Sequence, residues 1–371
     1  MTLPVTYRRA TREDDAEMRS FLHRSPSGGD VRLRIEKEPS FHAAFEVEGE
    51  RGDILLANDV DSGAIVGVGA RAEKAAFVNG VMHPLGYLST LRIDPAYRGG
   101  KVLKAGYTRF KEFHDAGRVR LYTTTIMTSN VVAVRALTQG RPGLPLYHDC
   151  GGYVTHVFGV RRNPFKARGD CTVRAATAAD ALALQSFWLK QGPKRQFFPY
   201  YSARHVVEPE GLLRGLNIWD FLIAERDGEI VGTAALWDQM PFRQWIIDGY
   251  SRRAGMMMPF YNLVARATGR PTFPRGGEAL DYRFLSLFVV ANADEKVALS
   301  LLSAIWHKAN TTAPDSLLVA GLHERDPLAH LLRRPPGVRF HSRLFVVHWD
   351  DGKEDFAALD GRVPYLEVGG L

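Results

Sequence analysis

An internal repeat limits the folds that this chain can adopt. The segment YRRATREDDAEMRSFL, from Tyr7, aligns with VRAATAADALALQSFW, from Val173. The offset is the same to within one residue for ILLANDVDSGAIVGVGA, from Ile54, and FLIAERDGEIVGTAALW, from Phe221. Identical pairs in the first alignment include Arg8 with Arg174, Thr11 with Thr177 and Asp14 with Asp180. We therefore expect two copies of one domain.

The repeated segments also give the expected order of elements. Two apolar strands flank a turn in each copy, at Asp61-Ser62-Gly63 and at Asp227-Gly228, which is typical of a β-hairpin. Each copy reads as strand, helix, variable region, hairpin, strand, helix, strand, helix and terminal strands. The predicted fold class is α/β (α+β), with domains at 1–162 and 163–371, each a mixed central sheet flanked by helices.

Two stretches interrupt the repeat. The sequence RRNPFKARGD, at Arg161–Asp170, mixes charge with Pro164 and Gly169, so we expect the linker there. The second copy carries an insertion at about 238–282, in which RQWIIDGYSRRAGMMMPFYNLVARATG has apolar residues at helical spacing. Its methionines are suited to an irregular acceptor pocket, but burial in the core or a contact between chains is the favoured interpretation.

The stretch GYLSTLRIDPAYRGGKVLKAGYTRFKEFH, at 86–114, reads as a strand, a basic turn with two glycines, and a helix. Leu88, Leu91 and Ile93 form the apolar pattern of the strand, which ends at Pro95 because proline cannot donate a ladder hydrogen bond. A helix after the glycines directs free N–H groups and a positive dipole end at the turn. Three cations surround the turn, Arg98, Lys101 and Lys104. The segment therefore predicts an anion site, with a pyrophosphate as the expected ligand.

This segment resembles the cofactor-binding motif of the GNAT superfamily of acyl-CoA N-acyltransferases. In that motif a strand ends in a Pro-x-x-Arg/Gln-x-x-Gly-x-Gly/Ala turn that binds the pyrophosphate of coenzyme A. Pro95 and Arg98 match, but the two small positions fall on Lys101 and Leu103, and the glycines lie earlier. With the repeat, the resemblance covers nearly the whole chain and implies tandem GNAT domains, as in N-myristoyltransferase-like and mycothiol synthase-like proteins. It implies transfer of an acyl group, expected to be acetyl from acetyl-CoA, to an amine.

The resemblance also implies which residues bind the cofactor. In GNAT proteins the strand pairs its backbone with the pantetheine arm, and the turn and helix start bind the pyrophosphate. The second family motif resembles LYTTTIMTSNVVAVRALTQG, from Leu121. The implied cofactor-binding residues are Leu91, Arg92, Ile93, Arg98, Gly99, Gly100, Lys101, Val102, Leu103, Lys104 and Asn130.

A general acid must protonate the thiolate that leaves, and a base must keep the amine neutral. The tyrosine that often serves as the acid in GNAT proteins falls on Leu137 here. Tyr147 is the candidate substitute, with a packing role at a strand start as the favoured alternative.

The strand at 88–93 holds no carboxylate, so the base must come from elsewhere. In GNAT proteins the variable region borders the acceptor, and here it supplies Glu36, Glu38 and His42. We select Glu38, because Pro39 restricts its surroundings and Phe41 offers an apolar wall that would raise its pKa. A solvated position is the alternative for each of the three. Tandem acyltransferases of the N-myristoyl type use a terminal carboxylate, which by this resemblance falls on Leu371.

The second copy lacks the basic turn. After its strand LSLFVV, Asp294 and Glu295 bring negative charge to the helix start, where they would cap the helix and repel CoA. We therefore expect one acyl-CoA site, in the first domain, with the second domain as scaffold and acceptor wall.

Composition gives weaker bounds on function. A net charge of +7 and a pI near 9.4 suit anionic ligands in general. The stretch PKRQFFPYYSARH, at 193–205, combines aromatic and basic residues as nucleic-acid sites do, but packing of its aromatic rings between helices or domains is favoured. Two cysteines are too few for a disulfide scaffold or a four-cysteine zinc site, and no metal is expected.

Two functions remain. The first is an N-acetyltransferase acting on a small-molecule or peptide amine, and the second is a catalytically silent protein that senses CoA or holds nucleic acid. The missing motif tyrosine favours the second slightly, and the intact run at 95–100 favours the first more strongly. No segment reads as a signal peptide or a membrane span, so a cytoplasmic protein is expected.

Overall fold

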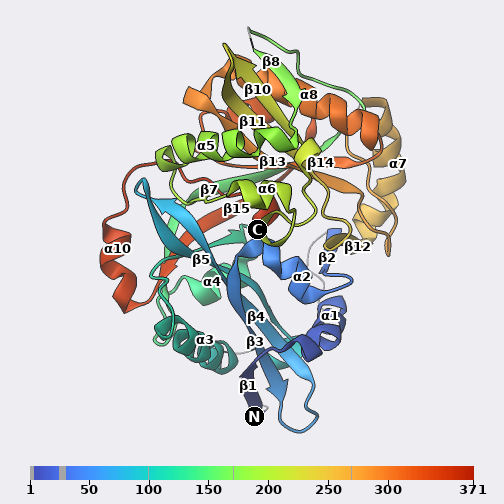
Figure 1. The fold of residues 1–371 in the computed structure, drawn as a ribbon. Coiled ribbons are helices and arrows are strands. Elements are labelled where there is room, and N and C mark those ends of the chain that lie inside the picture. Colours follow the sequence, from blue (N-terminus) through green and yellow to red (C-terminus); the bar gives the residue numbers. More distant parts are fainter. Residues whose placement is uncertain (1–3, 25–30, 99, 170, 269) are drawn as a thin grey trace.

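The computed structural model describes residues 4–24, 31–98, 100–169, 171–268 and 270–371, and one long sheet passes through both halves of the chain (Figure 1). The first half contains the strands β1 (Val5–Arg9), β2 (Val31–Glu36), β3 (Arg51–Asp59), β4 (Ile65–Val78), β5 (Val81–Ile93), β6 (Tyr122–Met127) and β7 (Leu146–Gly159). Its helices are α1 (Asp15–His23), α2 (Phe41–Phe45), α3 (Gly100–Asp115) and α4 (Val131–Leu137).

The second half follows the same order with additions. Its strands are β8 (Thr172–Ala175), β9 (Phe198–Pro199), β10 (Phe221–Arg226), β11 (Glu229–Trp237), β12 (Gln244–Tyr250), β13 (Tyr282–Val290), β14 (Leu317–His323) and β15 (Gly337–His348). Its helices are α5 (Ala181–Gln191), α6 (Ala203–Val207), α7 (Arg252–Thr268), α8 (Glu295–Thr312), α9 (Ala329–Leu332) and α10 (Lys353–Ala357).

The repeat recurs as the same hydrogen-bond network in both halves. Asp14 accepts hydrogen bonds from Arg8 Nη1 at 2.7 Å and from the backbone N–H of Thr11 at 2.7 Å. Asp180 accepts from Arg174 Nη2 at 2.8 Å and from the backbone N–H of Thr177 at 2.8 Å. In both halves the threonine and aspartate form a capping box, so the shared residues fix how the first helix leaves the first strand.

The terminal strands are exchanged between the halves. The sheet runs in the order β1-β3-β4-β5-β6-β15-β7-β14-β13-β11-β10-β8. The strand β15, from the second half, lies antiparallel between β6 and β7, and β7 pairs with β14. The sheet therefore joins the halves, and the division of the chain into domains at residue 162 stays a prediction.

Helices cover both faces of the sheet in the first half because apolar residues alternate along its strands. On β3, Ile54 and Leu56 pack against α1 and α2, whereas Leu55 faces the cluster that contains α3. In the second half, α5 covers one face and α8 the other. Each half is thus a sheet between two layers of helices.

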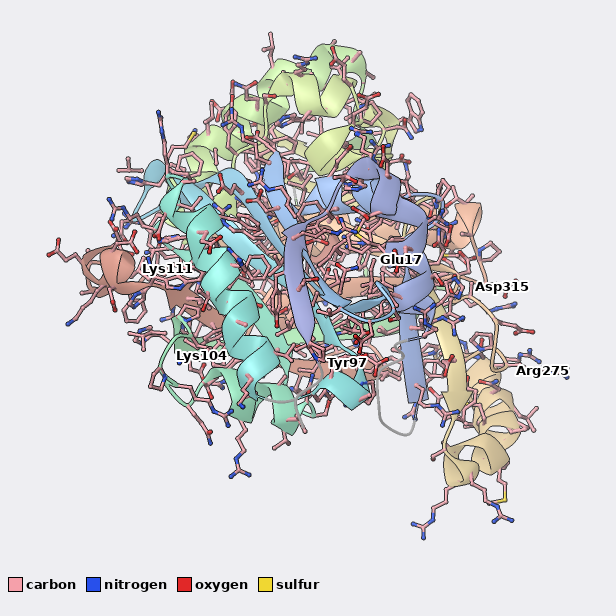
Figure 2. The ribbon with its side chains drawn as sticks, turned by 90° about the horizontal axis from the view of Figure 1, so that it is seen from below. Glu17, Tyr97, Lys104, Lys111, Arg275 and Asp315 are labelled. Carbon is pink, nitrogen blue, oxygen red and sulfur yellow. The ribbon has the colours of Figure 1, made fainter. Side chains whose placement is uncertain are left out.

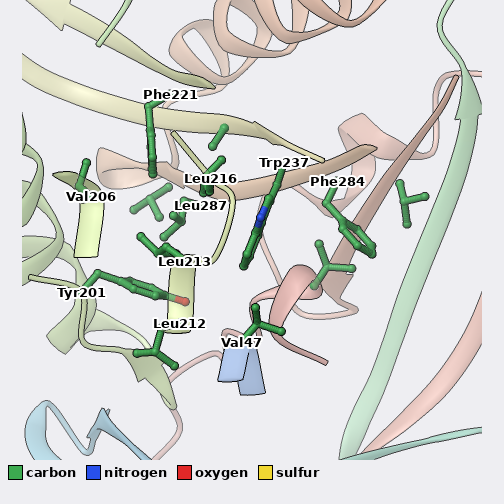
Figure 3. Close-up of a cluster of buried hydrophobic side chains, with 14 of the residues drawn as sticks. Val47, Tyr201, Val206, Leu212, Leu213, Leu216, Phe221, Trp237, Phe284 and Leu287 are labelled. Carbon is green, nitrogen blue, oxygen red and sulfur yellow. The ribbon is translucent and has the colours of Figure 1, made fainter. Parts of the chain in front are cut away.

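A shared core holds the halves together. Figure 3 shows Val47, from the first half, beside Trp237 of the second, and Leu213 belongs to the same cluster. The expected linker also packs, because Phe165 is buried with its ring centroid 5.4 Å from that of Trp306.

The stretch at 193–205 belongs to this core. Phe197, Phe198 and Tyr201 are buried, and β9 pairs with β4 of the first half. These rings therefore pack between the halves, as the favoured interpretation predicted, and cannot stack on bases without unfolding of the segment.

The predicted insertion forms a strand and a helix at one side of the molecule. Within it, β12 pairs with β2 in a separate two-stranded sheet. The helix α7 follows, and most of its apolar side chains are exposed. Burial in the core is therefore wrong for this helix, and the alternative of a contact between chains stays a prediction.

Candidate functional site

The pairing between β5 and its neighbour β6 ends after two residues, which leaves one edge of β5 open among the described strands. This strand pairs in parallel with β6 only at Gly86 and Tyr87, opposite Tyr122 and Thr123. From Leu88 onward, no described strand pairs with this edge of β5. Backbone N–H and C=O groups along this edge are thus placed to bind an extended ligand.

A β-bulge lies at the start of the open edge. Ser89 pairs with Ala70 and Arg92 with Val68, so Thr90 and Leu91 together lie opposite a single residue of β4. Thr90 has a φ of 53°, which is strained for a β-branched residue. Backbone strain of this kind occurs often at functional sites, where the surrounding structure maintains it.

The open edge leads to the basic turn that the sequence predicted. A short 3₁₀ turn at Pro95–Tyr97 follows β5, and α3 begins at Gly100. Gly99 lies outside the described residues. Arg98 Nε donates to the carbonyl of Ile93 at 3.2 Å, which fixes this side chain at the end of the strand.

Four predicted cofactor residues around this turn are cations, Arg92, Arg98, Lys101 and Lys104, and none of them forms an ion pair with a described carboxylate. Lys101 and Lys104 are exposed, and Figure 2 shows Lys104 on α3. Burial lowers the pKa of Arg92, and the charge of Arg98 adds to this effect. The positive charge near the start of α3 is therefore not neutralised by neighbouring acids.

The apolar residues predicted in the same motif also come together. Leu91, Ile93, Val102 and Leu103 line a pocket between α3 and the sheet, together with Gly69. Asn130 lies just before α4 instead, where its side chain accepts a hydrogen bond from the backbone N–H of Ala133 at 3.2 Å. Its observed role is therefore that of a helix cap.

A buried ionic cluster adjoins the bulge on the side of α1 and α2. The carboxylate of Glu48 is 3.1 Å from Lys37 Nζ and 3.3 Å from Arg243 Nη2. Its other oxygen accepts a hydrogen bond from the hydroxyl of Ser89, and Lys37 Nζ is 3.4 Å from the hydroxyl of Thr90. Burial acts to raise the pKa of Glu48, but the charges of Lys37 and Arg243 outweigh it, so its pKa is lowered and the group is ionised.

The last residues of the chain reach this cluster from the second half, and Figure 1 shows the C-terminus between the halves. Gln239 Nε2 donates to the carbonyl of Gly369 at 2.7 Å, and Tyr153 donates to the carbonyl of Leu366 at 3.2 Å. Arg243 Nη1 donates to the backbone oxygen of Leu371 at 2.8 Å. Leu371 therefore shares Arg243 with Glu48, and its role as a base stays a prediction.

Glu38 faces α1. Its carboxylate forms an ion pair with Arg19 and is 3.8 Å from His23 Nε2, and its backbone N–H donates to Gln244 at 3.1 Å. The apolar wall expected from Phe41 is instead covered by Lys37, whose Nζ lies 4.3 Å from the centre of the Phe41 ring. No described contact joins Glu38 to the bulge, and its role as a base stays a prediction.

Tyr147 lies on β7 near α3. Its hydroxyl is 2.5 Å from the hydroxyl of Tyr107, and its ring packs at an angle against Phe345. Burial raises the pKa of Tyr147 well above the ordinary value. Leu137, at the motif position of the family tyrosine, is buried in the same cluster. The proposed acid role of Tyr147 stays a prediction.

The second half contains the same bulge, but its own chain fills it. Leu287, on β13, has a φ of 47°, and its N–H donates to Glu367 Oε2 at 2.8 Å. Asp294 caps α8, with its carboxylate accepting from the N–H of Lys296 at 2.9 Å. The predicted capping of this helix by Asp294 is confirmed, and a carboxylate lies where the first half has basic residues.

Sequence reasoning missed the cluster of Lys37, Glu48 and Arg243. Glu48 follows FHAAFEV, a segment rich in apolar residues, and a carboxylate in such surroundings was the available signal. Arg243 lies 195 residues further along the chain, so no local pattern links the two.

The fold matches that of known acyltransferases. No known protein family and no curated protein matches the sequence. N-myristoyltransferase of Saccharomyces cerevisiae, solved with bound myristoyl-CoA, aligns with 94% of this chain and 84% of its own, with a TM-score of 0.57 and 11% identity. A GCN5-related N-acetyltransferase of Anabaena variabilis aligns with 92% of this chain and 72% of its own, with a TM-score of 0.52 and 11% identity. A probable N-acyltransferase of Enterococcus faecalis has the same coverage, with a TM-score of 0.53 and 9% identity. The chain thus has the GNAT fold, and the predicted fold class is confirmed.

Proposed function

We propose that this chain is an acyl-CoA-dependent N-acyltransferase with its cofactor site in the first half. The open edge of β5 carries the proposal, because it leads from the strained bulge at Thr90 to unneutralised cations at the start of α3. The resemblance and the names of the structural neighbours support the same reaction class. Acetyl-CoA is the first donor to test, and a longer acyl group stays open because one neighbour holds myristoyl-CoA.

The cofactor would lie in an extended form along β5. The pyrophosphate would bind at the start of α3, where the helix dipole and Arg98 and Lys101 favour an anion. The pantetheine arm would pair with the backbone at 91–93, which has no strand partner on that side among the described residues. This arrangement would place the thioester near the bulge.

The residues of the bulge and the ionic cluster suit the transfer step. An N–H of the bulge at Thr90 would donate to the thioester oxygen as negative charge develops there. The amine nitrogen would form a bond to the carbonyl carbon as the carbon–sulfur bond breaks, and the thiolate would leave. The amine proton would pass to the hydroxyl oxygen of Ser89 as the proton of Ser89 passes to Glu48.

The acceptor would be a small-molecule or peptide amine that approaches from the side of α1 and α2. The second half would form the opposite wall, because Arg243 and the segment that ends at Leu371 reach the cluster from there. The oligomeric state and the predicted cytoplasmic location stay open.

The test is release of free thiol from acetyl-CoA, octanoyl-CoA and myristoyl-CoA in the presence of a panel of amines. We expect thiol release that depends on the amine. Ser89→Ala should lower kcat and leave the dissociation constant of the cofactor unchanged. Ser286→Ala, at the matching position before the bulge of the second half, is the control and should keep full activity. Binding of CoA without amine-dependent release from any donor would instead support the catalytically silent alternative.

A further inference from the structure

The helix α7 presents an apolar face to solvent. Four of its apolar side chains are 66–70% exposed and one is 39% exposed. They are Met256, Met257, Phe260, Leu263 and Val264. At about 100° per residue, these five positions fall within an arc of about 120° on the outer side of the helix. Soluble chains rarely leave such a continuous face uncovered without a use for it.

The inner side of α7 is fixed to the body of the protein. Ala265 is fully buried, and Asn262 exchanges two hydrogen bonds with the backbone of Phe273, at 2.8 and 3.0 Å. The Tyr261 ring also packs against that of Phe273, with centroids 5.9 Å apart. The exposed face therefore belongs to a helix that is packed in place, and Figure 2 shows α7 at the margin of the molecule.

The surroundings of this face are positively charged. Between Asp248 and Glu278 the chain has no acidic residue and five arginines, Arg252, Arg253, Arg266, Arg270 and Arg275. None of these five forms an ion pair with another described residue. An apolar stripe with arginines beside it matches the apolar interior and anionic headgroups of a membrane surface.

We propose that α7 docks this protein on the surface of an anionic lipid bilayer. Phe260 and Leu263 would lie among the acyl chains, and the arginines would contact lipid phosphates. No helix in the described part of the chain combines the length and apolarity needed to cross a bilayer. A symmetric contact between two copies is disfavoured, because it would bring the arginines of both copies together.

The test is flotation of the purified full chain with lipid vesicles. We expect the protein to float with vesicles of phosphatidylcholine containing about 30 mol% phosphatidylglycerol, and to float less at high salt. It should stay unbound with phosphatidylcholine alone. Phe260→Ser with Leu263→Ser, and separately Arg253→Gln with Arg266→Gln, should each lower the bound fraction about tenfold.

The matched control is Leu182→Ser, which changes a 72% exposed leucine on α5 and should leave flotation unchanged. Equal melting temperatures would show that all variants fold. Absence of flotation with the anionic vesicles, or flotation that both double variants retain, would overturn the proposal. Light scattering that finds a dimer which Phe260→Ser with Leu263→Ser dissociates, without vesicle binding, would assign this face to a second copy.

Discussion

The two halves place the same bulged strand at their centres, but they differ in what surrounds it. In the first half, the edge of β5 beyond the bulge has no strand partner among the described residues, and cations lie near the start of α3. In the second half, Glu367 binds the N–H of Leu287 in the bulge, and Asp294 caps α8. In the second half, carboxylates of the chain itself thus occupy the positions that are left for a ligand in the first half. One repeated scaffold thus holds an open site in one copy and a closed, structural version of that site in the other.

The buried carboxylate of the first half, Glu48, should contribute most to stability. Glu48→Gln would leave Lys37 and Arg243 without their shared anion, at a cost of about 3–5 kcal/mol in the free energy of unfolding. Glu367→Gln, in the second half, should cost less, about 1–3 kcal/mol, because its hydrogen-bond donors are neutral. Urea unfolding measures both values. Equal losses would show that the cations around Glu48 do not make its carboxylate more important for stability than that of Glu367.

A second test concerns Lys74, whose charge interacts favourably with the carboxylates of both Glu48 and Glu367. Burial lowers the pKa of Lys74 to about 8 from 10.5. Between these values the unfolded chain keeps a proton that the folded chain has lost, so this group makes the free energy of unfolding rise with pH. Below pH 8 Lys74 is protonated in the folded chain, and the cost of burying this charge, up to about 3 kcal/mol, lowers the free energy of unfolding in full.

We therefore expect Lys74→Met to be more stable than the parent chain at pH 7, and the difference to shrink as the pH approaches 10. Unfolding by urea at pH 7, 8.5 and 10 tests this expectation. A variant that is less stable at pH 7 would show that Lys74 forms a favourable pair in the folded chain.

Arg98 tests whether the positive charge at the start of α3 contributes to CoA binding. Arg98→Ala removes a charge beside the start of α3 and should weaken CoA binding by about 1.5–3 kcal/mol, roughly ten- to a hundredfold. Asp294→Ala, at the matching helix of the second half, should leave CoA binding unchanged and lower stability by about 0.5–2 kcal/mol through loss of the cap. Unchanged binding in Arg98→Ala would remove this residue from the site.

The weakest change is expected for Tyr147. Tyr147→Phe should lower the maximal rate about tenfold and leave CoA binding unchanged, because a thiolate needs only modest help from an acid to leave. A lower melting temperature with an unchanged rate would instead assign the hydroxyl to its hydrogen bond with Tyr107. Leu137→Met, at the family's tyrosine position, is the control and should keep the parent rate.

Local sequence patterns predicted the parts of the fold that local chemistry decides. The cap that Asp294 forms on α8, and the turn of β3 into β4 near Ser62, follow from residues a few positions apart. The exchange of β7 and β15 could not be predicted in this way. It depends on pairing between strands that are far apart in the sequence. The apolar pattern of each strand would be the same whether the strand pairs within its own half or with the other half.

In the candidate site, too, the features formed by one short segment were predictable and those assembled from distant segments were not. The basic turn is one continuous segment, so its composition alone indicated an anion site. Glu48, Arg243 and Ser89 come from three separate parts of the chain, and only the fold brings them together. The sequence could not decide between core burial and exposure for the apolar face of α7, for a related reason. A stripe of apolar residues at helical spacing reads the same whether the body of the protein covers it or not.

The number of cofactors bound per chain tests the difference between the halves most directly. Isothermal titration of the purified chain with CoA should give one site, because among the described residues only the first half combines an open edge with unneutralised cations. Gly100→Asp should weaken this site further than Arg98→Ala, since it places a negative charge at the start of α3. Two equivalent sites per chain, or full affinity in both variants, would contradict the assignment of the cofactor site to the first half.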